Sequence, residues 1–502
     1  MQIEQERDIE MLRQVALLLE KENQRLHERL RVLVAELDTL KGADAGRLQF
    51  EIELLQQALA RQRQALFGES SERRPQPQTE ERQPHAATPR HGHGPRPQPR
   101  LPLIEAVHEL PEDERDCPVC GGQLAEMTGQ FEEADEISVV QRQFVVVQHR
   151  RQKYRCRCNA AVVTAPAPPK LQPGGHYSIE FAVEVAVGKY SDHLPLERQR
   201  RIMDREGLTV DSQTLWDQIE ALAQLLEPSY RALRPEVLAS PLVHADETHW
   251  RLMGKGEVTS RWWAWATASP EAICYEILPH RSQSAAKTVL GDYDGTVVAD
   301  GYGAYGALRK DGSRFRLVHC WAHVRRKFVK AAPHYPAECG TVLDLIGALY
   351  EIESEVPRAG PGENGAEARL ALRAKLRDER SREIVRKIHD WALTVGGLPQ
   401  SSFGRAVRYM LGLWPGLVAF LDDPKIPLDN NAIERGLRGL VLGRKNHYGS
   451  RSRRGTEVAA IFYSLIETAK LRGAEPRGYL LRAAHAALKT PPAVLLPELT
   501  RA

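Results

Sequence analysis

Hydrophobic residues in the first forty positions recur at alternating intervals of three and four, which is the spacing of a coiled-coil seam. The seam consists of Leu12, Ala16, Leu19, Leu26, Leu30, Leu33, Leu37 and Leu40, with Asn23 in register. A buried amide at an a position fixes register and favours two strands. The pattern predicts a coiled coil within residues 1–69 through which the chain self-associates. The alternative is a helix that folds back on residues 48–66.

Apolar residues are scarce in residues 70–105, which are rich in Pro, Gln, Arg and His. Such a composition cannot bury a core and predicts a flexible linker. Arginines in the linker could contact DNA phosphates, but a solvated spacer accounts for the composition better.

Helical spacing returns over residues 173–235. Gly207 predicts a short turn between two helices, and Asp211 or Ser212 is expected to cap the second one. A pair of helices joined in this way is either a helix-turn-helix that binds DNA or ordinary packing.

Short alternating runs typical of strands begin at residue 242. The runs are LVHADETHW, VTSRWWAWATA and AICYEIL, followed by a helical stretch, SQSAAKTVL, and two further strands, GTVVAD and RFRLVHC. Three strands, a helix and further strands follow the order of an RNase-H-like α/β core, in which the first and fourth strands are neighbours. We therefore expect a multi-domain chain whose RNase-H-like α/β domain spans residues 236–460, followed by a helical tail over 461–502.

The composition is that of a folded protein, with 42% hydrophobic and 27% charged residues. The net charge of +3, from 69 basic and 66 acidic residues, is too small to identify a nucleic-acid partner, so local clusters must do so. The charged start of the chain and the absence of an apolar run of about 18 residues argue against secretion and membrane insertion and favour the cytoplasm.

Four of the seven cysteines form two close pairs, Cys117 with Cys120 and Cys156 with Cys158. Two thiolate pairs can complete a tetrahedral zinc site, so residues 106–172 are predicted to form a zinc-finger-like module. The second pair has C-x-C spacing, which leaves His149 open as a substitute ligand. The alternative is four ordinary thiols.

Asp246 and Asp300 close the first and fourth predicted strands, and Glu434 follows on a predicted helix. Neighbouring carboxylates hold hard cations, so two Mg²⁺ ions, or Mn²⁺ in their place, are expected here to assist phosphodiester displacement. Each acid also has a plainer interpretation. Alternation puts Glu247 on the face opposite Asp246, with one of the two facing solvent, and Asp300 could be a turn residue. Glu434 could complete a capping box with Asn431 or pair with Arg438.

Glycines at 301, 303 and 306 spell a G-x-G-x-x-G motif after a strand, but the acid that a dinucleotide site needs about 20 residues later is missing. We interpret these glycines as allowing a sharp backbone turn. The run Trp262, Trp263 and Trp265 could stack on bases, although core packing explains it better. Basic residues surround the acids and are expected to contact DNA phosphates, a solvated basic face being the alternative. They are Arg325, Arg326, Lys327, Arg435, Arg438, Arg444, Lys445, Arg451, Arg453 and Arg454.

At this point the sequence resembles the insertion-sequence-66 family of DDE transposases over nearly its whole length. The resemblance rests on HLPLERQ, LVHADET, VVADGYGAY, HCWAHVRRKF, DNNAIER, LGRKN and SLIETAK, on the two cysteine pairs, and on LFGESSE after the coil. It implies that Asp246, Asp300 and Glu434 are the catalytic triad and that Cys320 and His323 form a structural C-x-x-H pair. It further implies that the catalytic domain, residues 236–460, contains a mainly helical insertion at about 321–428. It also implies a bacterial, nucleoid-associated protein that acts on inverted-repeat ends and target DNA with small accessory proteins.

Two features depart from what is expected. The C-x-C spacing leaves the zinc geometry open, and Gly436 and Gly439 lie in the Glu434 helix, each at a cost of about 1 kcal/mol relative to Ala. Two other functions remain in view: a non-catalytic DNA-binding protein, and a metal-dependent nuclease that cuts without joining.

Overall fold

A computed structural model of the 502-residue chain describes residues 143–155, 157, 161–254, 259–357, 364–395 and 400–499, together with scattered positions before residue 126. Apart from position 32, the predicted coiled coil and linker lie outside the described residues. The chain divides into two compact units, one of Met1–Glu72 with Phe144–Ala502 and one of Arg73–Gln143. The following description concerns Phe144–Ala502.

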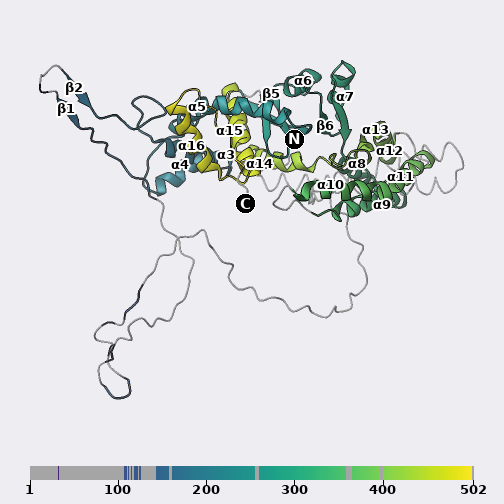
Figure 1. The fold of residues 1–502 in the computed structure, drawn as a ribbon, viewed down its shortest axis with the longest axis horizontal. Coiled ribbons are helices and arrows are strands. Elements are labelled where there is room, and N and C mark those ends of the chain that lie inside the picture. Colours follow the sequence, from purple (N-terminus) through teal and green to yellow (C-terminus); the bar gives the residue numbers. More distant parts are fainter. Residues whose placement is uncertain are drawn as a thin grey trace. The chain divides into compact units, whose positions relative to one another are not determined.

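One sheet in the described part of the chain has the strand order β5-β4-β3-β6-β7 (Figure 1). Its strands are β3 (Leu242–Met253), β4 (Thr259–Ala268), β5 (Ile273–Leu278), β6 (Thr296–Ala299) and β7 (Arg316–His319). The first three strands pair antiparallel, whereas β3 with β6 and β6 with β7 pair parallel. All five strands match predicted runs, and the expected contact between the first and fourth is confirmed. A separate hairpin joins β1 (Lys153–Arg155) and β2 (Val162–Thr164).

Helices cover the antiparallel half of the sheet and share one hydrophobic core with it. They are α3 (Ile179–Tyr190), α4 (Leu196–Arg205), α5 (Ser212–Leu238), α15 (Arg453–Leu471) and α16 (Pro476–Lys489). The edge strand β5 is closed by α15, because the backbone N–H groups of Ile273 and Tyr275 donate to Thr468 Oγ1 (3.1 Å) and Ser464 Oγ (2.9 Å). This contact uses backbone groups that an open edge would leave available for aggregation.

The predicted turn between two helices is confirmed at Gly207, whose φ of 85° is in the left-handed region that favours glycine. Asp211 is the N-cap of α5, and its side chain accepts a hydrogen bond from the Thr214 N–H at 2.6 Å. Helix α6 (Gln283–Leu290) follows β5, and helix α7 (Gly303–Lys310) follows β6. Both belong to the same hydrophobic core as the sheet, which includes Tyr305 of α7. None of the described helices combines the length and the apolar character needed to cross a bilayer.

A second hydrophobic core lies beyond β6 and β7, with Val298 and Val318 at its border with the sheet. Its helices gather in one bundle (Figure 1). They are α8 (Trp321–Ala331), α9 (Pro336–Ser354), α10 (Asn364–Leu376), η3 (Arg377–Ser381), α11 (Arg382–Thr394), α12 (Ser402–Gly412), α13 (Trp414–Leu417) and η4 (Ala419–Leu421). Inside the bundle Arg377 is buried and paired with Glu353, Nε to Oε1 at 2.6 Å.

Helix α14 (Asn431–His447) returns the chain from this bundle to the sheet, and its glycines make the return possible. A Cβ atom at Gly436 would lie 2.6 Å from Ile273 Cδ1, and one at Gly443 would overlap the Tyr463 hydroxyl. Tyr275 also donates a hydrogen bond to the Gly436 carbonyl at 2.8 Å. Close packing on β5 and α15 therefore explains residues that disfavour a helix by propensity.

Candidate active site

The register of two parallel strands brings Asp246 and Asp300 together. His244 of β3 is level with Val298 of β6, so two further residues along each strand place Asp246 level with Asp300. Neighbouring strands are about 4.8 Å apart. Asp300 directly follows β6, where its Oδ1 accepts a hydrogen bond from the Tyr302 N–H at 2.8 Å.

Glu434 lies in the first turn of α14 and faces α8. Its Oε1 is 3.6 Å from His323 Nε2, and its Oε2 accepts a hydrogen bond from Arg326 Nη2 at 3.4 Å. The capping-box interpretation is wrong, because the N-cap is Asn430 and Asn431 is already inside the helix. Among the described residues, Glu434 forms its ion pairs with His323 and Arg326 of α8 and not with Arg438.

Asn430 holds the start of α14 against β3 and against the start of α8. The sequence did not predict this role. Its side chain is fully buried, and its Nδ2 donates to the Ala245 carbonyl at 3.0 Å while Oδ1 lies 2.7 Å from His244 Nδ1. Its backbone N–H donates to Cys320 Sγ at 3.1 Å. Because Ala245 precedes Asp246, these bonds fix Glu434 relative to the first acid. The contact of Cys320 with Asn430 agrees with the expected structural role of that thiol.

The acids repel one another enough to change protonation. Burial, followed by the charges of Glu247, Asp300 and Glu434, raises the pKa of Asp246 to about 7. The Asp246 Oδ1 is held by the Glu247 N–H at 2.8 Å, which opposes that rise only in part. Asp246 is therefore a carboxyl group whose ionised form lacks compensation from the protein alone.

Glu247 is the more buried acid of the Asp246–Glu247 pair, whereas Asp246 is partly exposed. Its side chain is fully buried, and burial raises its pKa to about 7. Arg281 donates to Glu247 Oε1 at 2.7 Å and Tyr305 donates to Oε2 at 3.0 Å. The Arg281 guanidinium in turn lies 3.8 Å from the ring centre of Tyr302. A buried carboxylate, bonded to a partly exposed arginine and a buried tyrosine, thus supports β3 from the face opposite Asp246.

Divalent cations fit this arrangement of donors. Glu434 Oε1 is buried and accepts no hydrogen bond from the described residues, and the crowded charge at Asp246 is of the kind that a cation relieves. The described residues nevertheless contain no group of three or more His, Cys, Asp or Glu side chains already positioned as metal ligands. The Glu434 carboxylate is instead engaged by His323 and Arg326 of α8.

Close packing, and not the sharp turn that we expected, explains Gly301 after β6, whereas Gly303 and Gly306 have open space around them. None of Gly301, Gly303 and Gly306 has a positive φ. A Cβ atom at Gly301 would lie 2.6 Å from Tyr409 Cε2, and the Gly301 N–H donates to the Tyr409 hydroxyl at 3.1 Å. Trp265 is buried, as core packing predicted, and its Nε1 donates to the His280 carbonyl at 3.2 Å.

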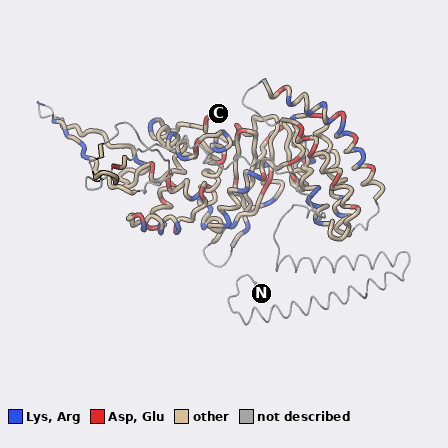
Figure 2. The backbone as a smooth tube through the Cα atoms, turned by 90° about the horizontal axis from the view of Figure 1, so that it is seen from below, with Lys and Arg blue, Asp and Glu red and all other residues tan. Residues whose placement is uncertain are grey.

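Basic residues near the acids fall into two groups. Arg326, Arg444 and Arg454 are engaged within the protein, the last with Glu220 at 3.2 Å and Glu457 at 3.1 Å. Lys327, Arg435, Arg438, Lys445, Arg451 and Arg453 are exposed, although Arg453 also pairs with Glu457 at 3.5 Å, and Arg325 is half-buried. Figure 2 shows that basic and acidic positions are interspersed over the described backbone. Local pairing, and not overall charge, therefore decides which cations are available to an anion.

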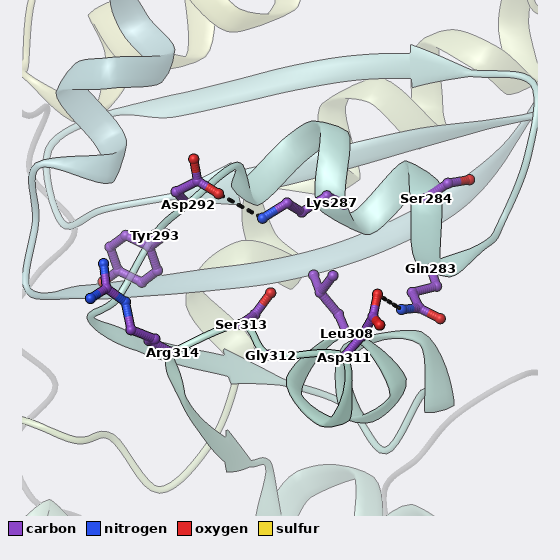
Figure 3. Close-up of a pocket in the computed structure, with 10 residues that line it drawn as sticks. All are labelled: Gln283, Ser284, Lys287, Asp292, Tyr293, Leu308, Asp311, Gly312, Ser313 and Arg314. Carbon is purple, nitrogen blue, oxygen red and sulfur yellow. Dashed lines mark hydrogen bonds and ion pairs between the residues drawn. The ribbon is translucent and has the colours of Figure 1, made fainter.

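A cleft of about 500 Å³ lies apart from the acids, between α6 and the loop after α7 (Figure 3). Its polar groups are satisfied by one another, since Lys287 pairs with Asp292 at 2.7 Å and Gln283 donates to Asp311 at 3.0 Å. It contains none of the three acids and adds nothing to the site described above.

Three of the four predicted zinc ligands, Cys117, Cys156 and Cys158, lie outside the described residues, and Cys120 is exposed. The structure therefore leaves the zinc prediction untested. Cys320, by contrast, is buried, and burial raises the pKa of its thiol to about 12.

Comparison with known proteins identifies the family to which the sequence belongs. Residues 174–458 match the model described as "Transposase IS66 family", and residues 114–159, which include all four paired cysteines, match "zinc-finger binding domain of transposase IS66". Three relatives from Sinorhizobium fredii are uncharacterized proteins: y4jD is 32% identical over 76% of both chains. The others, y4qI and y4hP, are 31% and 28% identical over 75% of this chain and 71% of their own length. The chain belongs to the IS66 family of transposases.

Proposed function

We propose that this chain is a DDE transposase that binds the ends of a mobile element, cuts the DNA there and joins the freed end to target DNA. The observation that carries the proposal is that Asp246 and Asp300 belong to adjacent parallel strands and that the charge of Glu434, on α14, helps to raise the pKa of Asp246. The strand order, with β3 and β6 adjacent, supports an RNase-H-like core. The helices from α8 to η4 correspond to the expected insertion at about 321–428.

The three acids would hold two Mg²⁺ or Mn²⁺ ions, which when bound stabilise the charge on attacking and leaving oxygens. The protein's own contribution is positioning. Asn430 fixes the start of α14 against β3, and the Tyr302 N–H orients Asp300. Arg326 and His323 position the Glu434 carboxylate. In the first reaction water displaces the 3′-oxygen at the element's end, and in the second that 3′-hydroxyl attacks a target phosphodiester.

DNA contacts are proposed for the exposed cations Lys327, Arg435, Arg438, Lys445, Arg451 and Arg453, and with less direct access for Arg325, Arg326, Arg444 and Arg454. Arg435, Arg438 and Lys445 lie on the exposed face of the helix that carries Glu434. Zinc bound by the paired cysteines would fold the preceding module. Self-association through the coil, small accessory proteins and association with the nucleoid remain proposals from the sequence.

The test is an assay of cleavage and strand transfer on a labelled duplex that carries the element's end, with Mg²⁺ and the element's accessory proteins. Asp300→Asn retains the oxygen that accepts from Tyr302, so the variant should fold and bind DNA but neither cut nor join. The matched control is Asp294→Asn, which removes an exposed charge from the preceding loop. Full activity of Asp300→Asn would refute the triad, and cutting without joining by wild type would indicate a nuclease.

A further inference from the structure

Two arginines face each other at the outer end of the β3–β4 hairpin. Arg251 of β3 is the direct register partner of Arg261 of β4, and both are exposed. Like charges directly opposite each other destabilise an antiparallel pair. Such a pair is therefore an arrangement that an anionic ligand would stabilise.

Arg444 of α14 adds a third positive charge to the same place. It donates to Thr248 Oγ1 at 3.1 Å and to the His249 carbonyl. The effect of the cluster extends to its neighbours: after burial, the charges of Arg444, Arg261 and Arg251 lower the pKa of His249. Arg251 likewise lowers the pKa of Arg444, again second to burial. The three guanidinium groups therefore act on one region of the surface.

No described carboxylate lies within ion-pair distance of Arg251, Arg261 or Arg444. Exposed arginines of the helical bundle behave differently, since Arg380 pairs with Glu355 at 2.7 Å and Arg386 with Glu383 at 3.0 Å. Among the described residues, the contrast separates surface arginines that pair with a carboxylate from a cluster that does not.

The cluster also rests on a rigid support. Trp250 is fully buried against His447 and Tyr463, and its Nε1 donates a hydrogen bond to Ser450 Oγ at 3.1 Å. The Ser450 N–H donates to the Arg251 carbonyl at 3.0 Å, and the Met253 N–H donates to the Ser450 carbonyl at 2.7 Å. The backbone that carries Arg251 is thus tied to the segment after α14. Cations on a fixed frame lose less freedom when they bind a regular anionic ligand.

Distance from the acids points to the ligand. Arg251 is five residues beyond Asp246 on one continuous strand, and at about 3.3 Å per residue this is about 17 Å. Phosphates along one strand of duplex DNA recur about every 3.4 Å of helix axis. A ligand that contacts both the acids and the arginine cluster must therefore span at least this distance and carry phosphates along it, as duplex DNA does.

We propose that Arg251, Arg261 and Arg444 form a phosphate-binding surface that contacts duplex DNA away from the reacting bond. The proposal rests on the transposase function given above and adds to it a defined contact outside the acidic site. The contact is to the phosphate backbone and so independent of base sequence.

The test compares Arg251→Gln/Arg261→Gln with wild type and with Arg380→Gln/Arg386→Gln, which removes the same number of charges from the helical bundle. Affinity for the labelled end duplex is measured over a range of salt concentrations. Each phosphate contact contributes about 0.9 to the slope of log affinity against log salt. We expect the hairpin variant to lose about 1.8 from that slope and the bundle variant to lose nothing.

The same proteins are also compared by thermal unfolding without DNA. Neither Arg251 nor Arg261 makes a side-chain hydrogen bond to a described residue, so the hairpin variant should unfold no earlier than wild type. Arg251→Lys/Arg261→Lys should keep most of the slope. Neutral methylphosphonates placed in turn along the duplex should locate the contact: at one position outside the cut they should weaken wild type and leave the hairpin variant unaffected.

An unchanged salt slope in the hairpin variant, with wild type still cutting and joining DNA, would refute this contact and leave the transposase function intact. A lower unfolding temperature with an unchanged slope would assign the arginines a structural role and refute it as well. Wild type that neither binds nor joins DNA would overturn the proposed function and this inference together.

Discussion

Replacing Asp246 with Asn should stabilise the metal-free protein while it abolishes DNA cleavage. Asp246 has a pKa of about 7 against an ordinary value of 3.8, because it is buried beside Glu247, Asp300 and Glu434. About three pKa units correspond to about 4 kcal/mol of destabilisation when the group is ionised. Glu247 shares the repulsion, so one substitution should relieve part of it, about 2 kcal/mol. The Asn oxygen can still accept from the Glu247 N–H.

The sign of the pH dependence follows from a pKa that is raised in the folded state. Between pH 4 and pH 7 the folded protein binds more protons at Asp246 than the unfolded chain does, so stability falls as pH rises through this window. The advantage of Asp246→Asn should therefore be full at pH 8, smaller at pH 5 and absent below pH 4. At pH 8 it should raise the unfolding temperature by roughly 4 °C.

Thermal unfolding at pH 8 and pH 5, with and without Mg²⁺, measures this effect. Mg²⁺ should stabilise wild type, since it binds the folded state, and should stabilise Asp246→Asn much less. Asp294→Asn, which removes an exposed carboxylate, is the control and should respond like wild type. Lower stability of Asp246→Asn at pH 8 without Mg²⁺, or an advantage that does not shrink at pH 5, would refute the reasoning.

Three further predictions follow from packing and charge. Arg281→Met should destabilise the protein by about 3 kcal/mol at pH 8 and by less at pH 5, because it leaves the Glu247 carboxylate buried without its cation; urea unfolding at both pH values measures the difference, and equal losses would contradict it. Gly443→Ala should lower stability by about 2 kcal/mol, because its methyl group would overlap the Tyr463 hydroxyl. Gly439→Ala should be neutral or stabilising, because the nearest atom to its methyl group would be an oxygen of the flexible Glu467 side chain at 3.3 Å. Replacing both cysteines of CPVCGG with Ser should abolish zinc binding, measured by metal analysis of the purified protein; retention of a full equivalent of zinc would rule out that pair as ligands.

The sequence was sufficient for the strands and for the relation between the first two acids. Alternating residues mark a strand locally, and the order of strands and helix predicted that β3 and β6 are neighbours. Once these two strands are parallel neighbours, their register alone places Asp246 level with Asp300. The turn at Gly207 and the cap at Asp211 were equally local, because each depends on one residue's backbone or side chain.

Tertiary structure decided what these local signals leave open. Strand alternation correctly put Glu247 on the other face from Asp246, but only the packing of α6 and α7 showed that this face is buried and that Arg281 and Tyr305 complete it. Asn430 had no distinguishing signal in sequence, because its three partners come from β3 and α8, more than 100 residues away.

The glycines and arginines show the same division in another form. A glycine in sequence indicates only missing bulk, and the structure supplied the reason: Tyr409 approaches Gly301, and α15 approaches Gly443. Basic residues could be counted from the sequence, but whether each is neutralised depends on which carboxylates lie within reach after folding. The sequence by itself therefore predicted the five strands of the sheet and the positions of the three acids along the chain. The burial of each side chain, the pairing of charges, and the lack of a described carboxylate partner for the arginines of the β3–β4 hairpin were decided by contacts between segments far apart along the chain.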